Sequence, residues 1–123
     1  MKQTLLCFFF AALLASCGNN TGKSAADKKT TPSAADSEAD KGLALVASNG
    51  CYTCHQVDQP GAGPAYTAVA ARYPNNDQVI DSLAQKIIKG GSGNWGTIPM
   101  IPHPGVSQED ARTMVKYVLS LKK

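Results

Sequence analysis

The chain has 123 residues, of which 43% are apolar, and it carries 12 basic against 9 acidic side chains, a formal net charge of +3. This size fits one small domain, and the lack of a basic block with interleaved aromatic residues excludes nucleic-acid binding. All three phenylalanines fall within residues 8–10. The core of a downstream domain therefore depends on aliphatic side chains, four tyrosines and one tryptophan.

Residues 1–16 are typical of a lipoprotein export signal. Lys2 forms the charged region, and residues 5–14 form an apolar stretch too short to span a bilayer, which takes about 20 residues in a helix. The sequence Leu14-Ala15-Ser16-Cys17 resembles the bacterial lipobox. We therefore expect Cys17 to be acylated and to begin the mature chain. An ordinary small-residue cleavage site before a cysteine is the alternative.

Residues 17–39 have the composition of a flexible linker. After Cys17 they contain no Leu, Ile, Val or aromatic residue, so they cannot bury a core. We predict that this segment is a disordered tether. Because a bacterial lipoprotein carries more than one acyl chain, we expect stable anchoring on the extracytoplasmic side of a bacterial membrane, facing the periplasm.

Helical periodicity begins at Asp40 and predicts an all-α domain over residues 40–123. Asp40 is the expected N-cap of a helix that Gly50 ends. No alternating strand pattern is present. The predicted helices cover residues 40–49, 66–72, 77–89 and a final segment that starts at Ser107.

Capping residues mark the ends of the later helices. Asn76 or Asp77 is expected to cap the helix over residues 77–89, and Gly90 is expected to stop it. Ser107 precedes Asp110 by three residues, which is typical of a loose capping box at the start of the last helix.

The sequence Cys51-Tyr52-Thr53-Cys54-His55 is a C-x-x-C-H run, the pattern of covalent haem attachment. Both thiols of such a run add across the vinyl groups of haem, and the histidine ligates the iron. The small domain and the long loop over residues 90–106 also favour a large buried cofactor. A redox dithiol would need a preceding strand. A zinc site would have to combine Cys51, Cys54, His55 and His103, without a second paired motif.

His55 leaves a second axial position on the iron to be filled. The candidates are Met100, Met114, His103, a tyrosine, or no side chain. Met114 lies in the apolar stripe of the last helix, where we expect it to pack in the core. Met100 lies in the proline-stiffened segment 95–102, which we expect to present one side chain from a loop without helix or strand.

Four segments of the chain match a known family in order. They are Gly50-Cys51 to His55, Gly63-Pro64-Ala65-Tyr66, Trp95 to Pro102, and Tyr117-Val118-Leu119-Ser120. On these residues the chain resembles the short bacterial class I cytochromes c, which are monohaem electron carriers. The resemblance implies a small cytochrome c fold around one covalently bound haem c. It also implies that the first and last helices cross near Gly50, with Val46 or Ala47 against Tyr117.

The same resemblance implies roles for individual residues. His55 and Met100 would be the axial ligands of the iron. Cys51 and Cys54 would form the thioether bonds, and the Pro64 carbonyl would accept a hydrogen bond from the His55 ring.

Two positions depart from the family pattern. Short bacterial cytochromes commonly pair an Arg with the loop tryptophan at a haem propionate, whereas this chain has Lys86 beside Trp95. A lysine is a point donor, so this pairing is expected to be looser. Some relatives place an Asn three residues after the ligand Met100, where this chain has His103. We expect His103 to be a solvent-facing loop residue, with a donor to the Met100 sulfur as the alternative.

With both axial positions closed, the resemblance implies a monomeric one-electron carrier and not an enzyme. Electrons would pass through an exposed haem edge near Cys51, ringed by residues 59–63, to redox protein partners such as a terminal oxidase or another reductase. Five lysines are candidates to orient an acidic partner: Lys86, Lys89, Lys116, Lys122 and Lys123. The alternatives are a haem peroxidase or gas-binding sensor with a displaceable methionine, and a non-haem zinc or dithiol module.

Overall fold

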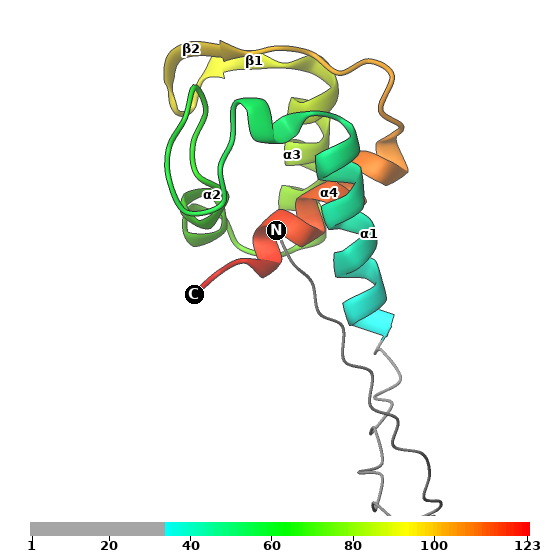
Figure 1. Ribbon diagram of the computed structural model, residues 1–123. Helices are drawn as coiled ribbons and strands as arrows, with labels where there is room; N and C mark the ends of the chain where they lie inside the picture. The colour runs from blue at the N-terminus through cyan, green and yellow to red at the C-terminus, as the bar shows by residue number, and fades with distance from the viewer. Residues whose placement is uncertain (1–33) are drawn as a thin grey trace, which may run out of the picture. The chain divides into compact units, whose positions relative to one another are not determined.

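The computed structural model describes residues 34–123. Within this range the chain forms four α-helices, one turn of 3-10 helix and a two-stranded sheet (Figure 1). The elements are α1 (Ala34–Ser48), η1 (Cys51–Thr53), α2 (Tyr66–Arg72), α3 (Asp77–Lys89), β1 (Gly91–Gly93), β2 (Gly96–Met100) and α4 (Gln108–Ser120). The predicted all-α class is confirmed. None of the described helices is both long and apolar enough to cross a membrane.

The later helices begin at the predicted caps. The Asn76 side-chain oxygen accepts a hydrogen bond from the Val79 backbone N–H at 3.0 Å, at the start of α3. The Ser107 hydroxyl oxygen accepts from the Asp110 N–H at 3.1 Å, at the start of α4. The Asp110 carboxylate accepts from the Ser107 hydroxyl at 2.8 Å. The two residues thus form a local pair that satisfies an otherwise free N–H of the first turn.

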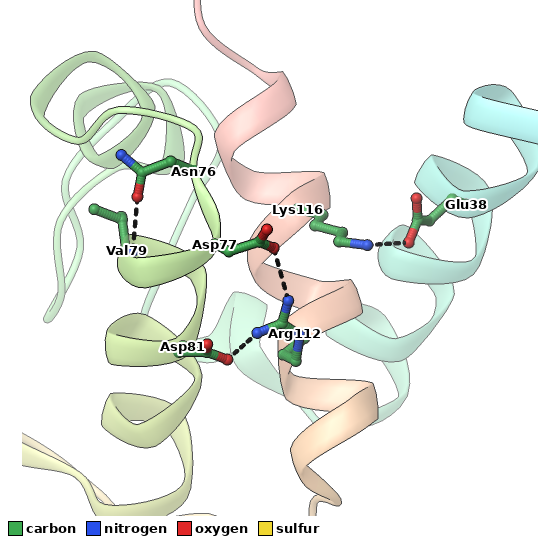
Figure 2. A network of polar contacts seen from close by, with 7 residues as sticks. All are labelled: Glu38, Asn76, Asp77, Val79, Asp81, Arg112 and Lys116. Atoms are coloured by element: carbon green, nitrogen blue, oxygen red, sulfur yellow. Dashed lines mark hydrogen bonds and ion pairs between the residues drawn. The ribbon is translucent and has the colours of Figure 1, made fainter.

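Helix α1 begins earlier than predicted. We expected a linker through residue 39 and a helix from Asp40, but residues 34–39 already belong to α1. Their alanines and Glu38 are good helix formers, although they supply little apolar surface. The Glu38 carboxylate also receives the Lys116 ammonium of α4 at 2.7 Å (Figure 2). The predicted export signal, most of the linker and Cys17 lie outside the described residues.

Helices α1 and α4 cross at Gly42, not near Gly50 as the family resemblance implied. A Cβ atom on Gly42 would lie 2.5 Å from the Tyr117 Cβ and 2.7 Å from the Thr113 carbonyl oxygen. The two backbones approach this closely only because Gly42 has no side chain. Val46, one turn later, is 1% exposed and belongs to the buried group against which Tyr117 packs, as the resemblance implied, whereas Ala47 is exposed.

The core consists of two groups of side chains on the faces of α4. Ile80 and Ala84 of α3 pack against one face, with three residues of α4: Ala111, Val115 and Leu119. Val46, Tyr66 and Met114 form the second group, which joins α1, α2 and α4. Met114 is fully buried there, as its place in the helical stripe predicted.

A polar contact on the surface also joins α3 to α4. The Arg112 guanidinium of α4 binds the carboxylate of Asp77, at 2.9 Å, and that of Asp81 (Figure 2). Asp77 and Asp81 are one helical turn apart, so they present both acceptors to the same guanidinium. Because Asp77 and Asp81 are exposed and Arg112 is only half-buried, the contact contributes less to stability than the apolar core does.

The loop predicted over residues 90–106 contains a β-hairpin. β1 and β2 pair antiparallel, with Gly91 opposite Met100 and Gly93 opposite Gly96, and the register shifts between the two pairs. The prediction of no strand was wrong in this segment, because its glycines mask the alternation on which strand prediction depends. The hairpin lies at the end of the domain away from the first turn of α1 (Figure 1).

Candidate haem-binding site

A cavity of about 360 Å³ lies between the C-x-x-C-H run, the hairpin and helices α3 and α4. Leu83, Ile87, Val115 and Val118 supply much of its apolar wall. All the site residues predicted for residues 40–123 line this one cavity: Cys51, Cys54, His55, Pro64, Lys86, Trp95 and Met100. Residues nearly fifty positions apart in the sequence therefore meet at one site.

The C-x-x-C-H run follows directly after Gly50, which lies just beyond the end of α1 and has a φ of 67°. An L side chain rarely adopts this left-handed conformation, so glycine allows the chain to turn at once into η1. The Cys54 and His55 N–H groups then both donate to the Cys51 carbonyl, at 3.2 and 3.0 Å. This turn places both free thiols and the imidazole on the cavity wall. Burial raises the pKa of the Cys51 thiol.

The His55 ring is held by the loop that follows it. Its Nδ1 atom lies 2.8 Å from the Pro64 carbonyl oxygen. A carbonyl only accepts hydrogen bonds, so Nδ1 carries the proton and Nε2 keeps its lone pair. The ring also lies where a Cβ atom on Gly63 would be. The geometry thus leaves Nε2 as the nitrogen with which His55 can bind a metal.

Met100 is the last residue of β2 and is half-buried in the cavity wall. It is therefore presented by a strand end and not by the irregular loop that we predicted. Gly90 lies against the Met100 carbonyl, in a conformation with a φ of 66°, so a side chain at position 90 would displace this segment. Ile98 and Ile101, on either side of Met100, are 66% and 65% exposed.

His103 is half-buried and lines the same cavity as Met100. Its backbone N–H donates to the Ile87 carbonyl at 3.1 Å, and its own carbonyl accepts from the Val106 N–H at 3.1 Å. These bonds fix the segment against α3. His103 is thus a loop residue, as expected, but its side chain is only partly exposed and lines the cavity.

Trp95 and Lys86 line the cavity, as predicted, but Trp95 has a partner that the sequence analysis missed. The Arg72 guanidinium carbon lies 4.6 Å from the Trp95 ring centroid, and the group donates to the Asn94 carbonyl at 2.7 Å. This cation–π contact ties the end of α2 to the tip of the hairpin. No local pattern pointed to Arg72, because its partners follow more than twenty positions later.

Comparison with known proteins agrees with this geometry. Residues 39–122 match the family model for cytochrome c. The chain belongs to the cytochrome c family. It is 44% identical over 81 residues to cytochrome c-551 of Azotobacter vinelandii, which covers 66% of this chain and 98% of that protein. It is 41% identical over 78 residues to cytochrome c-552 of Hydrogenobacter thermophilus, which covers 63% of this chain and 79% of the relative.

Solved structures of cytochromes c show the same fold. Cytochrome c552 of Nitrosomonas europaea matches with a TM-score of 0.61 and 42% identity, over 65% of this chain and 99% of that structure. The predicted small cytochrome c fold is confirmed, and like its relatives the protein carries one covalent haem c.

The residues of the cavity fit such a haem. Two free thiols three positions apart, an imidazole with a free Nε2 and a thioether face a largely apolar space. Within residues 34–123 no three His, Cys, Asp or Glu side chains gather into a metal site of their own. The donor set therefore suits an iron porphyrin better than a bare zinc ion.

Proposed function

We propose that the protein is a one-electron carrier whose six-coordinate haem is bound by His55 and Met100 and attached through Cys51 and Cys54. The observation that carries this proposal is that these four side chains line one cavity, with His55 already oriented by the Pro64 carbonyl. When bound, haem c supplies a reversible one-electron iron couple. The relatives named above are cytochromes c-551 and c-552, which supports the same role.

The protein's own residues explain why no substrate chemistry is expected. His55 and Met100 occupy both axial positions in this proposal, so neither oxygen nor peroxide finds a free site on the iron. A methionine ligand favours the reduced state. The apolar wall formed by Leu83, Ile87 and Val115 excludes water and favours it further.

The redox partner is proposed to dock around the cavity mouth. Residues 90–106 contain no Lys, Arg, Asp or Glu, and their Ile98 and Ile101 side chains are largely exposed. Such a surface suits a small, transient contact whose centre is uncharged or apolar. Two of the five candidate lysines already have acidic neighbours, since Lys116 binds Glu38 and Lys123 binds Asp58. Lys86 and Lys89 on α3 are the better candidates to orient a partner.

We further propose that acylated Cys17 tethers the protein to the extracytoplasmic face of a bacterial membrane. Support comes from the lipobox-like sequence Leu14-Ala15-Ser16-Cys17. The described chain begins at the end of α1 away from the hairpin (Figure 1). The electron acceptor in this proposal is a terminal oxidase or another reductase.

Visible spectroscopy tests the proposal. The denatured protein should show the alkaline pyridine spectrum of a haem with two thioether bonds, and the folded ferric protein should show the weak absorption band of methionine bound to iron. A haem spectrum without this band, together with direct binding of cyanide or peroxide, would contradict the carrier role and support a peroxidase or gas-binding sensor. A protein without covalent haem would contradict both.

A further inference from the structure

Tyr66 packs against the C-x-x-C-H run, although it lies outside that motif. It is the first residue of α2 and only 6% exposed. Its ring lies 5.4 Å from the His55 ring, centroid to centroid, with an angle of 10° between the planes. Cys51 packs against the buried group to which Tyr66 belongs. One buried side chain thus stacks on the proposed axial ligand and belongs to the group that a proposed haem attachment point packs against.

The Pro64 hydrogen bond alone does not fix the plane of the His55 ring. A hydrogen bond from Nδ1 tolerates a range of angles, so by itself it leaves the ring some freedom to tilt. A flat ring stacked nearly parallel on the imidazole opposes that rotation, because turning would push the two faces together. The position of Gly63 limits movement as well, since His55 fills the space of its missing Cβ.

Tyr66 is itself held in place by further contacts. Tyr52 packs edge-on against it, with ring centroids 5.9 Å apart and planes at 64°. Tyr66 also belongs to the buried group with Val46 and Met114. Burial raises the pKa of Tyr66 well above its ordinary value, so its hydroxyl stays neutral. Because several neighbours hold the Tyr66 ring in place, the ring can restrict the orientation of the His55 ring stacked on it.

We propose that Tyr66 is a positioning residue that sets the plane of the His55 imidazole by stacking, while Pro64 sets its direction. This inference rests on the proposed ligation of iron by His55. Neighbouring groups that orient a ligating histidine commonly tune the metal. The plane of an axial imidazole determines how unpaired spin spreads over a ferric haem, so the proton shifts of the haem methyl groups report it without any assay of electron transfer.

The test compares Tyr66→Leu, Tyr66→Phe and Tyr52→Leu in the haem-loaded ferric protein. Tyr66→Leu keeps apolar volume but removes the flat ring, and it should change the order and spread of the haem-methyl resonances. Tyr66→Phe keeps the ring and should retain the wild-type pattern. Tyr52→Leu removes a ring that contacts Tyr66 and not His55, so it should change the pattern less than Tyr66→Leu does. A wild-type pattern in Tyr66→Leu, or an equal change in Tyr66→Phe, would overturn the proposal.

A second measurement on the wild type covers the case in which Tyr66→Leu fails to fold or to take up haem. In the diamagnetic ferrous protein, nuclear Overhauser contacts between the Tyr66 and His55 ring protons should be observed. Their absence would show that the rings are not stacked and would overturn the inference. The axial ligands are checked separately by the methionine band, so a failure of the proposed function is distinguished from a failure of the role given to Tyr66.

Discussion

Gly42 of α1 lies so close to Tyr117 of α4 that a Cβ atom at position 42 would be 2.5 Å from the Tyr117 Cβ. Replacing glycine by alanine inside a helix normally stabilises it by about 1 kcal/mol. Here Gly42→Ala should instead lower the free energy of unfolding by ~1–3 kcal/mol, because the helices must separate. The urea midpoint of the haem-loaded protein measures this. Gly105→Ala is the control, because no atom lies within 4 Å of the added Cβ at that position. It should change the urea midpoint little.

Met100→Ala should lower the reduction potential and open the iron to exogenous ligands. The physical reason is that methionine stabilises the ferrous state and fills the sixth position. Potentiometry and cyanide titration measure the two effects. Met114→Leu is the matched control, because Met114 is buried in the core and its replacement conserves volume. An unchanged potential and spectrum in Met100→Ala would refute the ligand assignment.

Cys17→Ser should release the protein into the soluble extracytoplasmic fraction with its haem in place. Only the proposed acylation site is lost, because the attachment of the haem depends on Cys51 and Cys54. Membrane fractionation and the mass of the mature N-terminus measure the change. Cys7→Ser, within the predicted signal, should leave the membrane association and the mass of the mature N-terminus unaltered. A native mature chain that starts elsewhere and carries no acyl mass would contradict the lipoprotein proposal.

His103→Asn should weaken the pH dependence of the reduction potential. A protonated histidine in the cavity wall adds a positive charge near the iron and disfavours the ferric state. The wild-type potential should therefore be higher when this histidine is protonated than when it is neutral. Haem propionates give the same trend. The decisive quantity is therefore the difference in the pH dependence of the reduction potential between the wild type and His103→Asn. Identical pH profiles would assign His103 no part in the effect.

Alkaline pH should destabilise the protein through Tyr52. Burial and its contact with Tyr117, whose hydroxyl lies 3.3 Å away, raise the pKa of Tyr52 from 10.0 to about 12. The folded state therefore holds the phenol proton where the unfolded state has lost it, so this contribution is complete below pH ~10 and is lost as pH rises toward 12. Tyr52→Phe should flatten the fall in unfolding free energy over that window, measured by urea titration. An equally steep fall in the variant would contradict this assignment.

Local patterns in the sequence were sufficient for much of the fold and most of the site. The bounds of α2 and α3 and the caps Asn76 and Ser107 were predicted correctly, because helix ends depend on residues only a few positions apart. The C-x-x-C-H run is equally local, since its chemistry requires three side chains on one turn. Met100, which lines the cavity, was selected as a candidate through its proline-rich neighbourhood.

Other features depend on residues far apart in the chain, and only the tertiary structure decided them. The crossing of α1 and α4 at Gly42 depends on Thr113 and Tyr117, more than seventy positions later. Arg72 on Trp95 and His103 in the cavity wall depend on how the hairpin packs against the helices. The composition of a segment determines which local structure it can form. The distant residues that it contacts are determined by how the helices and the hairpin pack against one another.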